Sequence, residues 1–411
     1  MSIILDKNRL HKRPGYLESI RPFIGNDIIK ILTGQRRVGK SYMLKSIMEE
    51  IKASDKEANI LYIDKELEEF SFITNHQQLN EYVLQKLSAE KKNYLFIDEI
   101  QEIDSFQRCL RSLLNQQKCD IYCTGSNANM LSGELATLMA GRYMEFPIHS
   151  LSYSEFLKFN KTEDSNENLN AYLTIGGMPY QHNIGLDKTL VFEYLKNVYA
   201  SILLKDVVSR EGIRNVALLE NLVAYLADNT GSLFSAQNIS KYLKSQHISI
   251  PVQSVVNYLR ALTNAYFVHK VSRADIKGLK IFESGEKYYF EDLGIRNCIR
   301  TFNYRGEINK LMENAVYLHL LRNGFKAFVG KDGDREIDFI AEKNGERFYI
   351  QVAYLLGNES TLKREFGNLT AIRDNYPKYV VTLDEFIPAH TFKGIQQLHL
   401  RDFLLKVDLS R

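Results

Sequence analysis

One stretch near the amino terminus constrains this chain more than any other: Gly34-Gln35-Arg36-Arg37-Val38-Gly39-Lys40-Ser41. It fits the pattern G-x-x-x-x-G-K-[ST], in which main-chain amides curl around a phosphate group. Residues 28–33 before it are apolar and β-branched, as a buried strand is, and apolar residues recur after it at helical spacing as far as Ile51. Strand, glycine loop and helix in this order predict a phosphate-binding loop.

The pattern assigns a task to each residue type. Lys40 would reach the β- and γ-phosphates as a point charge, and the Ser41 hydroxyl would ligate Mg²⁺. Arg36 and Arg37 either reach phosphate oxygens or hold the loop against a nearby acid. We expect the nucleotide to contact the loop and the residue after it: Gly34, Gln35, Arg36, Arg37, Val38, Gly39, Lys40, Ser41 and Tyr42.

A second signal is the apolar run Tyr94-Leu95-Phe96-Ile97, which ends in Asp98 and Glu99. A buried strand that ends in two acids is typical of a Walker B element. Asp98 would hold the Mg²⁺, and Glu99 would orient and deprotonate the attacking water. Both carboxylates emerge at the carboxyl edge of a parallel sheet, where ligands bind. The alternative for a strand-end Asp-Glu pair is a helix N-cap.

Two later segments carry further candidates for catalysis. The strand at 121–124 ends in Gly125-Ser126-Asn127. This end resembles that of P-loop ATPases of the AAA type, in which a polar residue contacts the γ-phosphate or the attacking water, and Ser126 or Asn127 fits that role. Capping of the helix that begins near Ala128 explains the same residues equally well. Arg142 lies before the strand 144–146 and can act as an arginine finger, in cis or from a neighbouring subunit. Packing on Tyr143 or pairing with Glu145 is the alternative.

The chain lacks the guanine-reading motif N-K-x-D, because Asn160-Lys161-Thr162-Glu163 departs from it at the last position. Adenine is therefore the preferred base. The expected ligands are ATP and Mg²⁺.

Bulk composition sets wider limits. A length of 411 residues suggests two to three domains, and a net charge of +3 is too small to argue for nucleic acid by itself. The four cysteines show no zinc spacing and indicate free thiols. No run approaches the roughly 18 apolar residues of a membrane span. We expect a cytoplasmic protein without a membrane segment, with a polar, solvated helical lead-in over residues 1–27.

The middle of the chain indicates two helical parts. Residues 152–215 predict a helical lid, broken at Gly176-Gly177-Met178-Pro179, and the glycine pair is either a nucleotide-sensing hinge or a turn. Asp206 and Arg210 stand four residues apart and can pair. Residues 216–290 predict a winged helix, with helices at 218–226, 235–243 and from Pro251, followed by two strands.

The winged-helix region is locally basic. Between residues 241 and 280, seven lysines and arginines face one acid, Asp275; they are Lys241, Lys244, Arg260, Lys270, Arg273, Lys277 and Lys280. Such a surface suits phosphate contacts, and Gln253, Ser254 and Asn257 can read bases from the expected recognition helix. Many winged helices bind only protein, so DNA and a protein partner both stay open.

From about residue 305, the pattern predicts a helix, a strand and a hairpin through Asn344-Gly345. This part resembles restriction-endonuclease-like nucleases, whose carboxylates gather Mg²⁺. Glu313 and Asp338 match that arrangement, and Glu336 shares a strand face with Asp338. Gln351 and Ala353 stand where the resemblance requires an acid and a lysine. An amide brings no charge to a hard cation, so we expect a nuclease fold without nuclease activity.

Taken together, these motifs resemble a widespread prokaryotic family of AAA-type P-loop ATPases with a C-terminal domain of unknown function. The segments that carry the resemblance are Gly34 to Ser41, 96–101, 124–127, Gly141-Arg142, 151–156, 176–179, Glu313-Asn314, 336–339 and Gln351-Val352. The resemblance implies an α/β fold with four parts: an AAA-like core over 1–150, a helical lid over 151–215, a winged-helix-like part over 216–300 and a degenerate nuclease-like part over 301–411.

The resulting hypothesis is a Mg²⁺-dependent ATPase whose cycle moves the C-terminal region, with Lys40, Glu99, Asn127 and Arg142 as catalytic residues and Ser41 and Asp98 as metal ligands. Two alternatives remain. One is a nucleotide-gated protein that binds or processes DNA, and the other is a slowly hydrolysing switch that recruits a protein partner. A homo-oligomer is compatible with all three.

Overall fold

The computed structural model describes residues 11–131, 139, 141–276, 278, 281–300, 303–356, 359–385 and 391–406. The chain splits into two compact units. Unit 1 holds the chain up to His149 together with Asn264–Tyr266, and unit 2 holds Ser150–Thr263 and the chain from Phe267 onward. Each unit has its own β-sheet, and the two are described separately below.

Unit 1 is built on a five-stranded, all-parallel sheet in the order β2-β3-β4-β1-β5. The strands are β1 (Ile29–Thr33), β2 (Asn59–Asp64), β3 (Asn93–Asp98), β4 (Asp120–Gly125) and β5 (Tyr143–Pro147). The strands β1, β3 and β4 are buried along almost their whole length, because helices cover both faces. This confirms the predicted α/β class and the strands expected before the loop and before the acidic pair.

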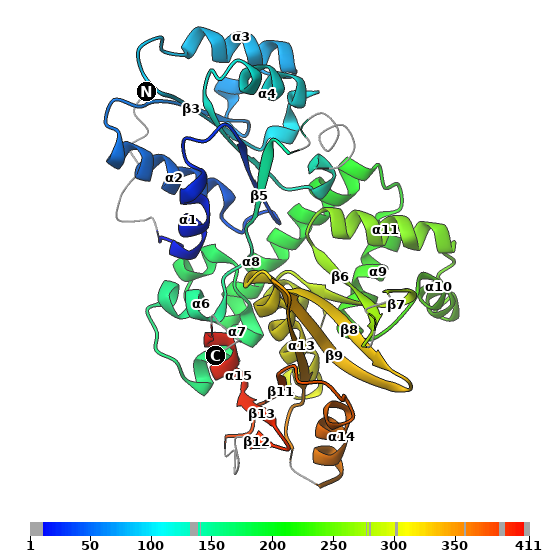
Figure 1. Cartoon of the computed structure of the whole chain (residues 1–411). Coiled ribbons are helices and arrows are strands. Elements are labelled where there is room, and N and C mark those ends of the chain that lie inside the picture. The colour runs from blue at the N-terminus through cyan, green and yellow to red at the C-terminus, as the bar shows by residue number, and fades with distance from the viewer. Residues whose placement is uncertain are drawn as a thin grey trace. The chain divides into compact units, whose positions relative to one another are not determined.

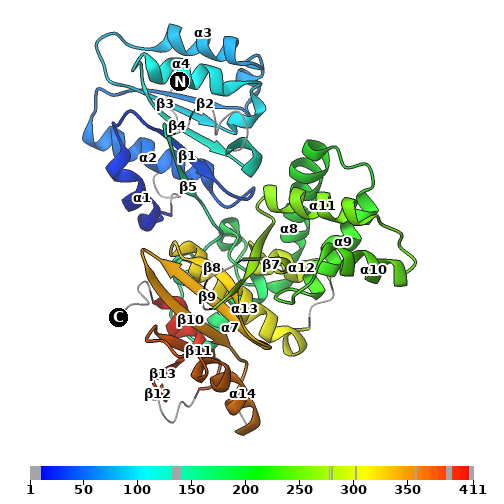
Figure 2. The same cartoon turned by 45° about the vertical axis from the view of Figure 1, so that its right-hand side comes forward.

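Figures 1 and 2 show α3 (His76–Lys86) and α4 (Phe106–Asn115) on one face of this sheet, and α1 (Pro14–Ile20) and α2 (Lys40–Ser54) on the other. Residues of α3 and α4 form an apolar core with the strands. Residues 1–10 of the predicted solvated lead-in lie outside the described residues; the rest forms the expected helix, with one face exposed and the other buried. Leu17 and Ile20 of α1 are buried, and so is Arg13 directly before it, because this helix packs beside α2.

Unit 2 contains an eight-stranded mixed sheet in the order β12-β13-β11-β10-β9-β8-β6-β7. Its strands are β6 (Val268–Asp275), β7 (Ile281–Phe290), β8 (Lys326–Asp332), β9 (Arg335–Lys343), β10 (Glu346–Val352), β11 (Lys378–Thr382), β12 (Thr391–Phe392) and β13 (Ile395–His399). The predicted hairpin is confirmed: β9 and β10 are antiparallel, and Asn344 and Gly345 both have positive φ angles, as a two-residue hairpin turn requires.

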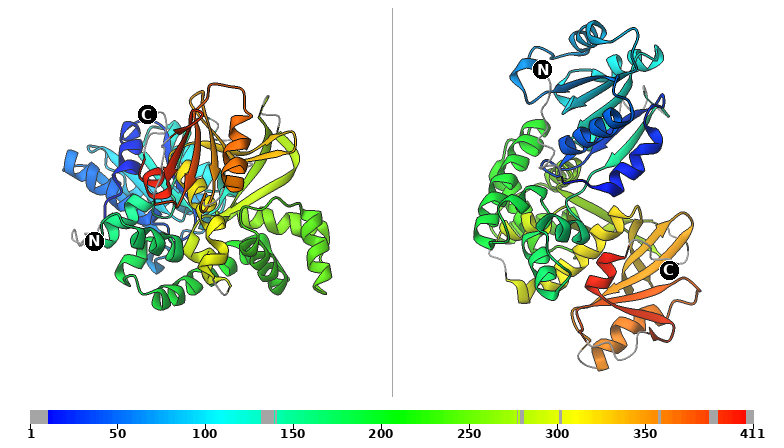
Figure 3. Two further views of the ribbon diagram at one scale, coloured as in Figure 1. Left: turned by 90° about the horizontal axis from the view of Figure 1, so that it is seen from below. Right: turned by 90° about the vertical axis from the view of Figure 1, so that its left-hand side faces the viewer.

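Two long helices cover this sheet. Figures 1 and 3 show α13 (Tyr304–Arg322) and α14 (Glu359–Thr370) on opposite faces of it. The short helix α15 (Leu400–Leu405) packs beside α13. Helix α14 is the crossover between β10 and β11, which are parallel, and its residues Phe366 and Leu369 enter an apolar core with Tyr349 and Val380.

The helical part of unit 2 comprises α6 (Tyr153–Asn160), α7 (Asn166–Ile175), α8 (Lys188–Ser201), α9 (Val216–Asp228), α10 (Ala236–Ser245), α11 (Val252–Asn264) and the short α12 (Leu293–Cys298). Helix α8 continues as a π-helical turn over Ile202–Ser209. The predicted pair of Asp206 and Arg210 forms there, at 3.3 Å. Helices α9, α10 and α11 match the three helices expected for a winged helix.

The strands expected to complete that winged helix have a different place. β6 and β7 pair with each other, and β6 also pairs in parallel with β8 over Arg273–Asp275 and Val329–Lys331. The sheet therefore runs across the boundary that the sequence suggested at residue 300. The sequence did not predict this, because a strand pattern says nothing about which distant strand will satisfy its open edge.

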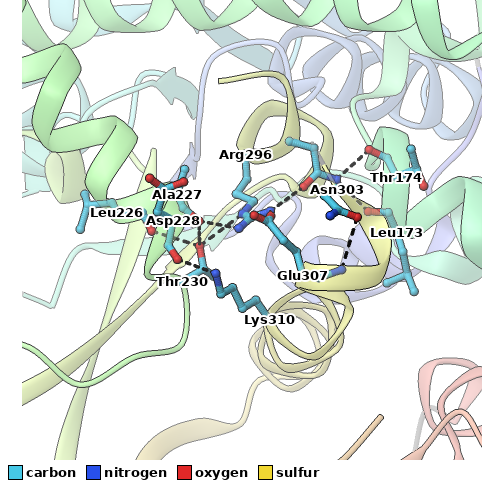
Figure 4. Close-up of polar contacts among 12 residues, drawn as sticks. Leu173, Thr174, Leu226, Ala227, Asp228, Thr230, Arg296, Asn303, Glu307 and Lys310 are labelled. Carbon is cyan, nitrogen blue, oxygen red and sulfur yellow. Dashed lines mark hydrogen bonds and ion pairs between the residues drawn. The ribbon is translucent and has the colours of Figure 1, made fainter. Parts of the chain in front are cut away.

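A polar network ties α9, α7, α12 and α13 together. Figure 4 shows Arg296 of α12 directed toward Thr230 and Glu307, and its guanidinium also donates to the main-chain carbonyl of Ala227. The neighbouring Asn297 donates to the carbonyls of Leu173 and Thr174 at 3.0 and 2.8 Å. A buried arginine is costly unless its donors are satisfied, so this network holds α12 in one position.

The start of α12 packs against Gly176 and Gly177, the glycine pair for which the sequence allowed either a hinge or a turn. Gly177 N–H donates to the Asp292 carboxylate at 2.7 Å, and Gly177 O accepts from Leu151 N at 2.7 Å. A Cβ on Gly176 would lie 2.4 Å from Gly294 N, and one on Gly177 would lie 2.4 Å from Leu151 O. Close packing of the main chain thus explains why both positions are glycine. This favours the turn over the hinge.

Two smaller expectations concern cysteines and the membrane. All four cysteines are free, as predicted. Among the helices that the structure describes, none combines the length and the apolar character needed to cross a bilayer.

Candidate nucleotide-binding site

The glycine loop follows the carboxyl end of β1, which is the strand between β4 and β5 in the sheet. It leads directly into α2. Its two fixed glycines have left-handed backbones, with φ of 139° at Gly34 and 98° at Gly39. A Cβ on Gly34 would lie 2.1 Å from the carbonyl oxygen of Ile148, so no larger residue fits there. The loop therefore has the geometry that the sequence pattern predicted, with its amides followed by the amino end of a 15-residue helix.

The side chain of Lys40 folds back into this loop. Its Nζ donates to the carbonyl oxygens of Gly34 and Gln35, both at 3.0 Å, and the residue is buried. The first turn of α2 contains no acid. The ammonium group and the amino end of the helix thus place positive charge inside the curl of the loop.

The other side chains expected to contact the nucleotide have different surroundings. Arg36 pairs with Glu66 at 3.1 Å, which confirms that one of the two arginines holds the loop against a nearby acid. Arg37 and Tyr42 are exposed, and Arg37 has a positive φ of 72°. Gln35 is almost completely buried, yet neither polar atom of its amide has a hydrogen-bond partner among the described residues.

The acidic pair faces the loop from the end of β3. Ser41 lies close enough to the Asp98 carboxylate to lower the pKa of that group, so the two predicted metal ligands are neighbours. Thr124 of β4 donates to Asp98 Oδ1, and the phenol of Tyr62 from β2 donates to Asp98 Oδ2 at 3.2 Å. The neighbouring strands on both sides therefore orient this carboxylate.

Burial raises the pKa of Asp98 above its ordinary value; hydrogen bonds from Ser41 and Thr124 oppose the shift, while Glu99 and Asp64 add to it. The pKa of Tyr62 is also raised, by burial and then by Asp98 and Asp64, which keeps its proton available for hydrogen bonding. A divalent cation beside Asp98 would favour the charged form of the carboxylate.

Glu99 follows in a left-handed conformation, with φ of 55°. Its N–H donates to the Thr124 hydroxyl at 2.9 Å, so one threonine contacts both members of the acidic pair. The Glu99 carboxylate accepts hydrogen bonds from the Gln101 amide and, at 3.3 Å, from the Ser126 hydroxyl. These contacts direct the carboxylate toward the end of β4 rather than into solvent, and Glu99 is buried.

The two candidates at the end of β4 differ. Ser126 is fully buried and contacts Glu99. The Asn127 side chain instead accepts a hydrogen bond from Asn129 N at 2.8 Å, as a cap of the turn Ala128–Leu131. The capping alternative thus accounts for the Asn127 oxygen in this structure, and contact with a γ-phosphate or water stays a prediction.

Arg142 lies at the opposite edge of the sheet from the loop. It directly precedes β5, whose first residue pairs with Ile29 at the amino end of β1, whereas Thr33 at the loop pairs with Pro147. About 13 Å of strand separates these two levels. The Arg142 guanidinium is exposed and donates to Asn115. Because β5 runs parallel to β1, the residue before β5 lies at the amino ends of these strands, away from the loop at their carboxyl ends. This position does not support an arginine finger in cis.

Sequence reasoning missed four residues of this site: Arg13, Tyr62, Gln101 and Thr124. Arg13 donates to the carbonyl oxygen of Val38, inside the loop, at 3.2 Å and to that of His149 at 2.8 Å. The position of Tyr62 could have been anticipated, because it lies two residues from the carboxyl end of the strand after the loop. Arg13 gave no such signal, since its contact with Val38 spans 25 residues that include α1 and β1.

The residues present fit a nucleoside triphosphate with a divalent cation. The orphaned Gln35 amide and the inward ammonium of Lys40 offer donors beside the loop amides, and Ser41 and Asp98 offer two oxygens of the kind that Mg²⁺ prefers. The loop amides and Lys40 would hold the phosphates, and Ser41 and Asp98 would hold the cation.

Comparison with known proteins agrees with this geometry. Residues 26–157 match the AAA domain family, and residues 166–305 match a domain of unknown function. A Walker-type ATPase of Pyrococcus abyssi has the same fold over 72% of this chain and 97% of its own, with a TM-score of 0.50 and 14% sequence identity. The fold and the loop thus define a P-loop protein with an AAA domain.

The family follows from sequence relatives. An uncharacterized protein of Haemophilus influenzae is 34% identical over 401 residues, which cover 96% of this chain and 98% of that protein. An uncharacterized protein of Methanocaldococcus jannaschii is 31% identical over 352 residues, covering 82% and 77%. The chain belongs to this prokaryotic family, which joins the AAA domain to the domain of unknown function.

Proposed function

We propose that this protein is a Mg²⁺-dependent ATPase. The observation that carries the proposal is the Lys40 ammonium folded into the loop, with Ser41 of the same loop close to Asp98 at the end of β3. A triphosphate needs cationic donors on one side and a cation held by oxygens on the other; Lys40 offers the first, and Ser41 and Asp98 offer oxygens for the second. Adenine is the preferred base, because the guanine-reading motif is missing.

The residues of the site divide the chemistry among them. The loop amides and Lys40 bind and orient the phosphates, and Thr124 and Tyr62 keep the Asp98 carboxylate directed at Ser41. Glu99 accepts the proton of the attacking water, and Ser126 and Gln101 hold its carboxylate in place. A divalent cation bound at Ser41 and Asp98 supplies charge neutralisation of the phosphates.

Two substitutions test this function. Lys40→Ala should weaken ATP binding by roughly 100-fold or more, because it removes the ammonium from the loop. Glu99→Gln should keep ATP binding while turnover falls by about 10² to 10⁴. Lys52→Ala, on the exposed side of the same helix α2, serves as the matched control and should leave both unchanged. ATP binding that survives Lys40→Ala at wild-type strength would refute the proposed site.

The same assay separates an enzyme from a switch. Phosphate release should exceed that of Glu99→Gln by at least tenfold in the wild type. Tight ATP binding with wild-type turnover as low as that of Glu99→Gln, at every protein concentration, would instead identify a nucleotide-dependent switch that recruits a protein partner.

A second candidate function is binding of DNA by α10 and α11. Residues 229–274 contain no acid, and Lys241, Lys244 and Arg260 are exposed on these two consecutive helices. Gln253 and Asn257 are exposed on α11 and hydrogen-bond to each other at 3.2 Å. Lys277 and Lys280, which the sequence added to this basic region, lie outside the described residues.

The salt dependence of DNA binding tests this second candidate function. Duplex binding should weaken with salt, and the Lys241→Ala, Lys244→Ala, Arg260→Ala triple variant should reduce the slope of log K against log salt by about 2 to 3. A matched variant with three exposed lysines of unit 1 changed to alanine, Lys52, Lys56 and Lys91, should leave the slope unchanged. Absence of duplex or single-strand binding at low salt would exclude the idea.

A further inference from the structure

Four charged side chains converge in unit 2, far along the chain from the nucleotide site. Lys287 of β7 extends its Nζ to Glu313 of α13 at 2.7 Å, to Glu336 of β9 at 3.0 Å and to Asp338 of β9 at 3.5 Å. The lysine side chain is only 3% exposed. The nearest in sequence of the three acids is 26 residues from it, so only the tertiary fold brings them together.

All three carboxylates of this cluster contact the ammonium group. It donates hydrogen bonds to Glu313 and Asp338, and Glu336 forms an ion pair with it at 3.0 Å. Other groups hold two of the acids in place. The Tyr289 phenol donates at 2.5 Å to the same Glu313 oxygen that Lys287 contacts, and Val352 N donates to the second oxygen of Asp338 at 2.9 Å. The ammonium thus lies among three carboxylates, two of which are oriented by other groups.

Electrostatics keeps the ammonium charged. Burial by itself lowers the pKa of Lys287, but Glu313, Asp338 and Glu336 together outweigh it, and the net shift is upward. Burial and the nearby Glu313 raise the pKa of Asp338 to about 7, and Lys287 opposes this rise. One positive charge is therefore shared by acids that would repel one another without it.

In the nucleases that this part of the chain resembles, carboxylates at these positions hold Mg²⁺, and the residues present here do not fit one. Gln351, in the place of the second acid, accepts a hydrogen bond from the Asp338 N–H at 3.4 Å. Ala353 stands in the place of the lysine. Mg²⁺ requires its oxygen ligands at about 2.0–2.1 Å, and the centre that these oxygens would surround is filled by the Lys287 ammonium.

We propose that Lys287 is the resident cation of this cluster: its ammonium group takes the place of a divalent metal ion and joins β7 to α13 and β9. Lys287 of β7 thereby supplies the lysine that position 353 lacks. It also supplies the positive charge that a metal ion would otherwise bring to the three acids. The cluster is then a structural joint of unit 2, with no capacity for metal-dependent cleavage. This inference is independent of ATP hydrolysis in unit 1.

Manganese tests the proposal, because free Mn²⁺ is counted directly by electron paramagnetic resonance. Nucleotide-free wild-type protein should bind no Mn²⁺ at this cluster up to about 1 mM, and its unfolding midpoint should not change with Mn²⁺. Lys287→Met should lower that midpoint by about 5 to 10 °C, because three carboxylates lose their cation. Mn²⁺ should then bind to the variant and recover part of the loss.

Two controls make the result decisive. Lys270→Met breaks the more exposed pair of Lys270 with Glu286 in the same hairpin and should cause neither effect. Asp338→Asn gives a second measurement that does not depend on the folding of Lys287→Met. Equal Mn²⁺ uptake by Asp338→Asn and wild type supports the proposal. Wild-type Mn²⁺ binding that Asp338→Asn abolishes, or Mn²⁺-dependent DNA cleavage by the wild type, would overturn it.

Discussion

At the scale of single residues, Thr124 does more for the nucleotide site than its small side chain suggests. Its hydroxyl donates to the Asp98 carboxylate and accepts from the Glu99 N–H at 2.9 Å. Both contacts are buried, so loss of this one oxygen leaves a charged acceptor and a main-chain donor without their partner. Supporting groups of this kind commonly change metal affinity or activity by 10- to 100-fold.

Thr124→Val is therefore expected to lower ATP turnover by about 10- to 100-fold and to raise the Mg²⁺ concentration needed for half-maximal activity. The free energy of unfolding should fall by about 1 to 3 kcal/mol, because valine keeps the shape but not the hydrogen bonds. Activity assays over a Mg²⁺ series and urea unfolding check this. Thr370→Val removes an exposed hydroxyl and is the control. An unchanged Mg²⁺ dependence would contradict the assigned role.

At the scale of elements, the turn between α7 and α8 and the start of α12 form one joint. Gly176 has φ of 77°, and a Cβ there would lie 2.4 Å from Gly294 N and 2.5 Å from Asp292 Oδ1. Gly185, a few residues later, has a similar φ of 88° with open space around it. Gly176 also has ψ of −160°, so a substitution there meets both backbone strain and close packing, whereas Gly185 meets backbone strain alone.

Gly185→Ala should lower the free energy of unfolding by about 1 kcal/mol, from backbone strain alone. Gly176→Ala should lower it by about 2 to 4 kcal/mol, because the Gly176 backbone lies in a region that essentially only glycine adopts and the added Cβ would clash with main chain that cannot move aside. Urea unfolding of both variants gives the comparison. Equal losses would mean that the contact with α12 is loose and that a hinge is again a valid explanation of the glycine pair.

The Asp292 carboxylate, which accepts a hydrogen bond from Gly177, should make the stability of the protein depend on pH. Burial raises the pKa of Asp292 to about 6, and hydrogen bonds from Gly177 and Ile295 only partly offset it. The folded chain then holds this proton more tightly than the unfolded chain, so its contribution to stability is present below about pH 4 and is lost as the pH rises to 6.

Asp292→Asn removes that titration. The unfolding free energy of the wild type relative to the variant should fall by on the order of 2 to 3 kcal/mol between pH 4 and pH 7. Denaturant unfolding of both proteins at a series of pH values measures the difference. A difference that is constant across this range would show that Asp292 titrates normally in the folded protein.

At the scale of the whole molecule, Arg142 raises the question of assembly. The guanidinium is exposed at the amino edge of the sheet in unit 1, where it cannot reach a nucleotide bound to its own loop. An arginine finger supplied by a neighbouring chain typically increases phosphoryl-transfer rates by about 10³ to 10⁵. If Arg142 has such a role, the active species contains at least two copies of this chain.

Arg142→Ala should then reduce turnover by at least about 10³, and wild-type specific activity should rise with protein concentration. Mixing Arg142→Ala with Glu99→Gln should recover activity, since one chain brings an intact Glu99 and the other an intact Arg142. Arg111→Ala, an exposed arginine of α4, is the control. Wild-type turnover by Arg142→Ala at every concentration would remove Arg142 from the catalytic residues.

What the sequence determined by itself is the local geometry of the phosphate loop and the acidic pair. Glycine at positions 34 and 39, lysine at 40 and the strand that ends at Asp98 depend on backbone conformation and on the edge of a parallel sheet, and short segments encode both. The hairpin at Asn344-Gly345 was readable for the same reason. These features repeat wherever the same few residues occur in the same order.

The tertiary structure decided which distant side chains meet. It placed Thr124 beside Asp98, Arg13 against the loop and Lys287 among three acids, and it joined β6 to β8 across the expected domain boundary. It also carried Arg142 to the far edge of its sheet. Strand order and helix packing follow from burial of apolar surface summed over a whole unit, so no short stretch of sequence contains them.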